Sequence, residues 1–193
     1  YQAILSHGYA MSVYGSNTKE FLDLVSVNEV SKALVLYPIG MALSQVIMGF
    51  ISDKKGRKTA AITVAANCVV SFVVFALGAK MNLNPSLVGF FCGAFVGSYY
   101  STNDVLIMMA SESAPTNLRS SATSAQTVVG FAGYAIGFII NTILALVFGD
   151  GVIGTVALCL LVPSFIATLI ALIKNTHDTK GLDLNTVTGT EWD

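Results

Sequence analysis

Charged side chains are scarce in this 193-residue chain: only 11% of the residues are Asp, Glu, Lys or Arg, whereas 54% are hydrophobic. A water-soluble domain of this size would need far more polar surface to cover its apolar groups. The net charge of −1 also provides no electropositive surface for nucleic acid. These shortages favour a membrane protein and argue against a nucleic-acid partner.

Cysteine is rare as well. Cys68, Cys92 and Cys159 stand far apart inside apolar runs, a spacing that supports neither a disulfide framework nor a metal-ligand cluster. The sequence also lacks a P-loop and a nucleophile motif. We therefore expect no metal, no cofactor and no enzymatic activity.

Long apolar segments dominate what is present. A helix needs about 20 mainly apolar residues to cross a hydrocarbon core of about 30 Å. Five segments meet this requirement, and a shorter apolar piece at the start resembles the end of a helix that begins upstream. The predicted crossings are residues 1–14, 32–51, 59–78, 87–110, 122–148 and 152–173.

The predicted fold class is therefore an all-α membrane protein with a six-helix transmembrane bundle. The bundle spans residues 1–174, and its first helix is truncated. Residues 175–193 form a polar tail, for which we expect little fixed structure.

Basic residues in the connecting loops predict the orientation of the bundle in a cell membrane, plasma or inner. Because each crossing changes sides, seven basic residues fall on one side, and only Lys19, Lys32 and Lys80 fall on the other. Loops rich in Lys and Arg remain cytoplasmic, so the first side and the C-terminal tail are predicted to be cytoplasmic. The seven residues are Lys54, Lys55, Arg57, Lys58, Arg119, Lys174 and Lys180.

The most highly charged loop reads GFISDKKGRK at residues 49–58. In one interpretation its charge merely keeps the loop in the cytoplasm. Its arrangement is more specific, because Gly49 permits close helix contact, Gly56 permits a tight reversal, and Asp53 needs a cation or a helix N-terminus as partner. The next cytoplasmic loop, ESAPTNLR at residues 112–119, offers both kinds of partner.

These loops resemble two signatures of the major facilitator superfamily. The first matches G-x-x-x-D-[RK]-x-G-[RK]-[RK], found between the second and third helices of each six-helix half; the second resembles E-x-x-P-T-x-x-R, found after the fourth helix. The stretch THDTKGLDL is similar to the P-E-T-K-G-x-x-L ending of the sugar-porter branch, with His177 and Asp178 in place of Pro-Glu. The resemblance implies the C-terminal half of a twelve-helix carrier, beginning within the seventh helix, whose partner is the N-terminal half of the same transporter.

The resemblance also implies a cytoplasmic gate. In such a gate Arg57 pairs with Glu112, and Arg119 completes a charge network that holds the two halves together in one state of the carrier. A fixed structural clasp is the alternative. The gating residues implied in this way are Gly49, Asp53, Gly56, Arg57, Lys58, Glu112 and Arg119.

Polar side chains inside the crossings are candidates for a solute or proton path. Asp104 lies inside an apolar run, on a helical stripe with Gly93, Gly97 and Tyr100. Either it carries a proton coupled to solute movement, or it hydrogen-bonds a neighbouring helix and stabilises the bundle. The other candidates are Tyr99, Asn103, Gln126, Tyr134, Asn141, His7, Tyr14 and Gln45.

We therefore expect a proton-coupled secondary carrier in the lipid bilayer that moves a small polar metabolite, an organic acid or a sugar, by alternating access. Ala10 stands where the sugar porters have a sugar-contacting Asn, and their Pro- and Trp-bearing tenth helix has no counterpart. Two alternatives remain. A carrier-derived receptor or sensor would bind the solute without moving it, and a homodimer of six-helix units would need a complete first helix.

Overall fold

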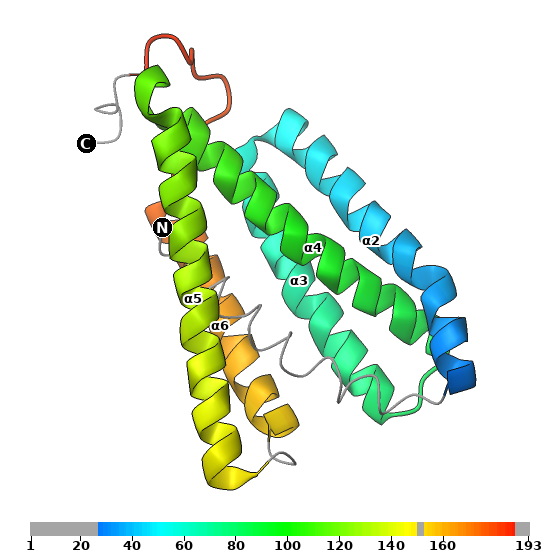
Figure 1. The fold of residues 1–193 in the computed structure, drawn as a ribbon. Helices are drawn as coiled ribbons and strands as arrows, with labels where there is room; N and C mark the ends of the chain where they lie inside the picture. The colour runs from blue at the N-terminus through cyan, green and yellow to red at the C-terminus, as the bar shows by residue number, and fades with distance from the viewer. Residues whose placement is uncertain (1–26, 150–152, 188–193) are drawn as a thin grey trace.

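The computed structural model describes residues 27–149 and 153–187 (Figure 1). Within these residues all regular secondary structure is helical, so the all-α prediction is confirmed. Each of the five complete predicted crossings falls on one long helix, while the predicted first crossing, with His7 and Tyr14, lies outside the described residues. The elements are α2 (Val27–Lys55), α3 (Arg57–Lys80), α4 (Pro85–Glu112), the short 3-10 helix η1 (Thr116–Leu118), α5 (Arg119–Phe148) and α6 (Ile153–Asn175).

Short turns with local signals separate the helices. Gly56 alone stands between α2 and α3, and its φ of 102° belongs to the region that glycine adopts without strain. At the start of α4, the Asn84 side chain accepts a hydrogen bond of 2.9 Å from the Ser86 amide, and Pro85 occupies the first turn. Pro115 then ends the α4 segment and leads through η1 into α5.

Three stretches of the described residues are long and apolar enough to cross a membrane by length and composition: Ser31–Lys55, Arg57–Phe75 and Thr116–Phe148. Val162–Asn175 is a shorter apolar stretch. The 28-residue α4 falls outside this set, and it contains more polar groups in its middle, including the fully buried Ser98. Because neighbouring helices cover this part of α4, the polar side chains of Ser98, Ser101 and Thr102 are shielded from the surroundings by protein.

Helix α4 packs directly against the backbone of α2 through a row of glycines. A Cβ atom added to Gly89 or Gly93 would lie 2.0 Å from the carbonyl oxygen of Ala33 or Tyr37, respectively. From α2, a Cβ on Gly40 would lie 2.1 Å from the Phe90 carbonyl oxygen. Only hydrogen fits at these positions. This row of glycines, the α2–α4 seam, therefore sets the separation of the two helices.

The other face of α4 packs against α3 and α6 in two hydrophobic clusters. Three phenylalanines meet in the first: the ring of Phe95 lies 5.1 Å from that of Phe72 and 6.0 Å from that of Phe165, between centroids. The second cluster lies nearer the α2–α3 turn and joins small residues of α3 to larger ones of α4 and α6. Its buried members are Ala60, Ala61, Ala65, Val105, Leu106, Met109 and Leu172.

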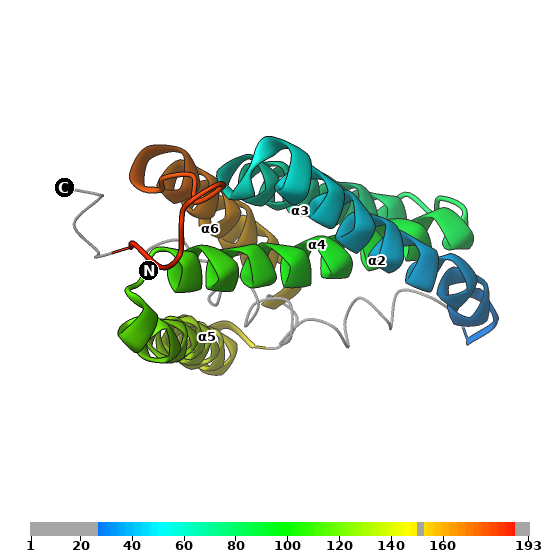
Figure 2. The same ribbon diagram turned by 90° about the horizontal axis from the view of Figure 1, so that it is seen from above.

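Helix α5 lies on the opposite side of α4 from α3, as the view from above shows (Figure 2). In Figure 1, α4 and α5 meet at the upper end and diverge toward the lower end. Much of α5 faces outward with large apolar side chains, among them Val128 and Phe131 at 67% exposure and Leu146 at 82%. Such a helix needs lipid or another protein surface as its environment.

Candidate functional site

Side chains from α2 and from the end of α4 meet at Arg57 beside the α2–α3 turn. Its Nε donates a hydrogen bond to Glu112 Oε1 at 3.2 Å, and its Nη1 donates to Ser52 Oγ at 2.5 Å and to Asp53 Oδ1 at 3.3 Å. The Arg57 and Glu112 side chains are only 23% and 19% exposed, whereas that of Asp53 is 79% exposed. The expected contact between Arg57 and Glu112 is therefore present, and it is the shielded pair of this cluster.

The C-terminal segment 176–187, drawn in orange to red, returns to this end of the bundle (Figure 1). The buried Thr179 hydroxyl donates a hydrogen bond to Glu112 Oε2. Val187, near the end of the segment, is also buried. The expectation that this tail lacks fixed structure is wrong for these residues, because their side chains and backbone bind the helix ends.

Asp178 supplies a cap that α3 lacks in its own sequence. The N-cap residue Gly56 has no side chain, and Asp178 Oδ1 instead accepts a hydrogen bond of 3.0 Å from the Arg57 amide. Any Cβ on Gly56 would lie 2.0 Å from Asp178 Oδ2. The glycine is thus required twice, for its backbone conformation and for the space that the carboxylate occupies.

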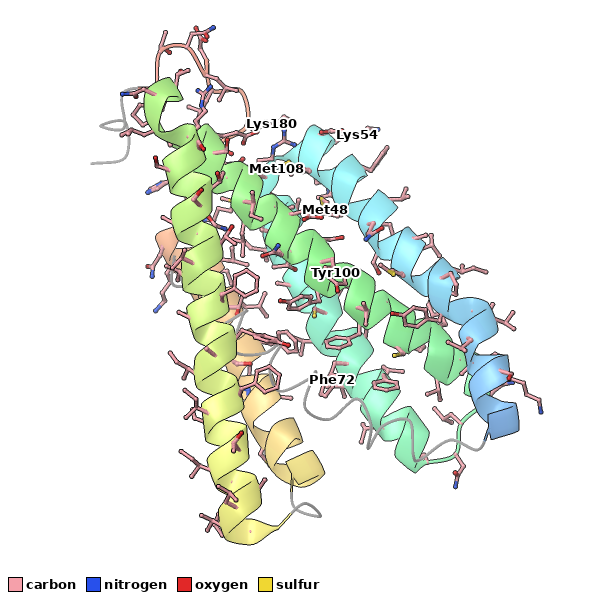
Figure 3. The ribbon with its side chains drawn as sticks, viewed as in Figure 1. Met48, Lys54, Phe72, Tyr100, Met108 and Lys180 are labelled. Atoms are coloured by element: carbon pink, nitrogen blue, oxygen red, sulfur yellow. The ribbon has the colours of Figure 1, made fainter. Side chains whose placement is uncertain are left out.

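Two lysines tie the same segment to the helices. Lys58 Nζ donates hydrogen bonds to the carbonyl oxygens of Ile173 and Thr176, at 3.0 and 2.7 Å, and so satisfies acceptors at the end of α6. Lys180 Nζ donates to the Lys54 carbonyl oxygen at 2.5 Å, and Figure 3 shows both residues at this end of the molecule. The basic residues of the loop therefore stabilise helix ends in addition to carrying charge.

Arg119 does not complete the charge network as expected. Its Nε donates to the Ala114 carbonyl oxygen at 3.3 Å, and its Nη2 donates to that of Leu184. No carboxylate within the described residues pairs with it. The physical reason is that the returning C-terminal segment offers backbone acceptors closer to Arg119 than the acids around Arg57.

A cleft of about 270 Å³ opens between the α2–α3 turn and the C-terminal segment. Two acids and two bases line it, so it combines charges of both signs in a small volume. Its lining residues include Asp53, Arg57, Glu112, Thr179 and Lys180.

The candidate stripe on α4 divides into two environments. Gly93 and Gly97 are buried against α2, whereas Tyr100 and Asp104 are exposed. Asp104 makes no hydrogen bond to any residue that the structure describes. The whole stripe therefore cannot line a solute or proton path. Its first half packs against α2, and only its second half presents polar side chains at the surface.

The neighbouring candidates on α4 and α2 are dispersed. Tyr99 packs against the phenylalanine cluster and stacks edge-on with Tyr100, with centroids 5.5 Å apart (Figure 3 labels Tyr100 midway along α4). Asn103 is half-buried, and Gln45 of α2 is exposed.

On α5, Gln126 is only 4% exposed, so its amide lies within protein. Tyr134 stacks edge-on with Phe138 at 4.7 Å between ring centroids. Asn141 belongs to α5, but its side chain lies outside the described part of the chain. Among the side chains that the structure describes, neither Gln126 nor Tyr134 forms a hydrogen bond with Asp104.

Sequence reasoning missed several residues that build the site. Asp178 and Thr179 occupy the second and third positions of the stretch similar to P-E-T-K-G, which was a sequence signal for their involvement. Ser52 and the polar contact between α3 and α4 at Asn67 carried no such signal. Serines and lone asparagines are common in apolar helices, so only their contacts distinguish them.

The fold and the site together define a class of protein: a multi-pass helical membrane protein whose charged groups are clasped at one end. The family model of the Major Facilitator Superfamily matches residues 3–188. The chain therefore belongs to this superfamily, whose members transport small molecules across membranes. Neither the curated proteins nor the solved structures gave a significant match.

Loss of the Asp178 carboxylate is expected to release the C-terminal segment. Asp178→Ala should lower the free energy of unfolding by about 1 kcal/mol, the usual contribution of an N-terminal helix cap. It should also speed proteolysis at Lys180, since the segment loses its tie to α3. Thermal unfolding and limited trypsin digestion of the purified protein measure both effects.

Asp183→Ala is the matched control, because within residues 27–149 and 153–187 the Asp183 carboxylate accepts a hydrogen bond only from the nearby Asn185 amide, at 3.1 Å. Equal losses in the two variants would contradict a specific role of Asp178 in capping α3.

Proposed function

We propose that this chain is the C-terminal six-helix half of a twelve-helix carrier that moves a small polar metabolite, an organic acid or a sugar, by alternating access. The observation that carries the proposal is the clasp at one end of the bundle, in which Arg57, Glu112 and the C-terminal segment join three helix ends. Membership of the transporter superfamily supports it. In this proposal the clasp faces the cytoplasm, and the protein lies in the plasma or inner membrane.

The cytoplasmic clasp acts as a gate between two states of the carrier. The proposed gating residues are Gly49, Asp53, Gly56, Arg57, Lys58 and Glu112, and Arg119 supports them by binding the C-terminal segment at the Leu184 carbonyl oxygen. A few partly shielded ion pairs suffice for this role, because two states of a carrier differ by only a few kcal/mol.

The N-terminal half of the transporter binds the exposed surfaces of the bundle. Helices α2 and α5 both expose large apolar side chains, such as Val46 at 69% and Phe131 at 67%. A Cβ on Gly49 would have no neighbour within 4 Å, which leaves room for a second helix at the start of the charged loop. One surface faces lipid and the other faces the partner half.

The solute and proton path uses the exposed second half of the α4 stripe. Tyr100 and Asp104 lie one turn apart on this face, with Asn103 beside them. An acid within a membrane protein is costly unless it serves a cavity or a partner, and Asp104 has no partner among the described residues. Further members of the path are Tyr99, Gln126, Tyr134, Asn141, His7, Tyr14 and Gln45.

Uptake by the full-length protein reconstituted into liposomes tests this function. Organic acids and sugars are screened as radiolabelled solutes, with and without a proton gradient. A carrier accumulates at least one of them above the level of empty liposomes. A receptor derived from a carrier would bind a solute in equilibrium dialysis and accumulate none.

Asp53→Asn should leave folding intact but slow transport. Among the described residues the highly exposed Asp53 carboxylate pairs with Arg57 alone, so its contribution to stability is about 0.5 kcal/mol or less. In the gate it meets the partner half, and its loss should reduce turnover about tenfold, equivalent to about 1.4 kcal/mol. Initial uptake rates at saturating solute measure the effect.

Lys55→Gln is the control for that experiment. Lys55 is exposed and occupies the undefined position just before the second glycine of the G-x-x-x-D-[RK]-x-G signature. Unchanged turnover in Asp53→Asn would reduce the loop to a signal for membrane orientation.

A further inference from the structure

A polar contact joins α2, α3 and α4 near the middle of each helix. Asn67 Nδ2 of α3 donates a hydrogen bond to Ser98 Oγ of α4 at 2.7 Å and a longer one to Ser44 Oγ of α2 at 3.4 Å. The Ser44 hydroxyl in turn lies 3.1 Å from the carbonyl oxygens of both Gly40 and Ala94. Ser44 and Ser98 are buried, at 5% and 0% exposure.

This contact lies between the glycine row of α4 and the second hydrophobic cluster. Before it, the glycine row of α4 rests on the α2 backbone, up to Gly97 against Met41. After it, Val105 and Met109 of α4 pack on the alanines of α3. Small-residue seams let helices approach closely but form no directional bond between them. A hydrogen bond between the helices adds a directional constraint to this packing.

We propose that Asn67 is a positioning residue. It fixes the α4 segment that carries Tyr100 and Asp104, both in its rotation about the helix axis and in its position along that axis. The inference rests on the proposed function of that segment as part of the solute path. Asn67 acts on α4 through Ser98, because the amide contacts α4 on the turn preceding the exposed stripe. Asn67 is itself at an exposed position, and an amide on a membrane helix is unfavourable unless it has a hydrogen-bond partner or a wet cavity.

The orientation of α4 can be measured without knowing the solute. A reporter cysteine, Tyr100→Cys, is placed in the full-length protein with the exposed Cys159 replaced by Ser. Its reaction rate with a water-soluble maleimide is followed at a temperature well below unfolding. Asn67→Ala and Ser98→Ala should each change this rate about threefold, the ratio that one average interhelical hydrogen bond shifts between two orientations.

The double variant Asn67→Ala/Ser98→Ala should change the rate no more than either single variant, because both remove the same hydrogen bond. Thr63→Ala is the matched control: Thr63 lies one turn before Asn67 on α3, is exposed, and donates only to Thr59 of its own helix at 2.8 Å. It should leave the rate unchanged.

Unchanged labelling in folded Asn67→Ala and Ser98→Ala, or changes that simply add in the double variant, would overturn the proposal. If Asn67→Ala fails to fold, Ser98→Ala decides alone, since alanine keeps the helix and nearly the same volume. The labelling assay contains no solute, so its failure would be separate from a failure of the liposome uptake assay that tests transport.

Discussion

Gly93→Ala is expected to force α2 and α4 apart and to destabilise the whole bundle. The added Cβ would lie 2.0 Å from the Tyr37 carbonyl oxygen and 2.8 Å from its carbon, both backbone atoms of a continuous helix. Such a contact cannot be relieved by a side-chain rotation, so the helices must separate along the seam. We expect a loss of about 3 kcal/mol in the free energy of unfolding, at the upper end for overpacking. Thermal unfolding of the purified protein in detergent measures it.

Gly49→Ala provides the control for this experiment. It adds the same methyl group to a helical glycine of α2 whose Cβ position has no neighbour within 4 Å. Because alanine is the better helix former, this variant should keep or raise the stability, by up to about 1 kcal/mol. Similar destabilisation in the two variants would show that an added methyl group is harmful at any of these helical glycines, and not specifically at the α2–α4 seam.

Asp104→Asn is expected to abolish uptake driven by a proton gradient. The asparagine keeps the size and polarity of the side chain but cannot bind or release a proton. Exchange of labelled for unlabelled solute across the liposome membrane should continue, because exchange needs no net proton movement. Measuring both processes in one preparation separates proton coupling from solute binding.

The exchange rate is the internal control for folding and for the path itself. Undiminished uptake under a proton gradient in Asp104→Asn would remove Asp104 as the coupling residue. Loss of exchange together with uptake would also contradict the expected result, since it would indicate a role of Asp104 in holding the bundle or the solute.

Apolar segment length was sufficient to predict the five long helices that the structure describes, because a bilayer imposes a minimum length that few other structures require. The contact between Arg57 and Glu112 could also be predicted, from two charged signatures two crossings apart. In both cases the information is local to a short stretch of sequence, and the family supplies the spatial relation between the stretches.

Other parts of the structure depend on contacts between distant segments. Helical spacing correctly places Gly93 and Asp104 on one face of α4. It does not indicate which part of that face α2 covers. Similarly, Gly56 reads as a turn residue, and only the structure reveals that Asp178, a residue of the distant C-terminal segment, occupies the space beside it. Long-range packing of this kind leaves little trace in a single sequence.

The most direct test of the account is the sidedness of the clasp. A cysteine at Lys55→Cys, beside the clasp, and one at Leu83→Cys, in the α3–α4 turn at the other end, are labelled in intact cells with a membrane-impermeant maleimide; both positions are exposed. The account predicts that the Leu83 variant reacts in intact cells and that the Lys55 variant reacts only after the membrane is permeabilised. Reaction of the Lys55 variant in intact cells would contradict a cytoplasmic gate.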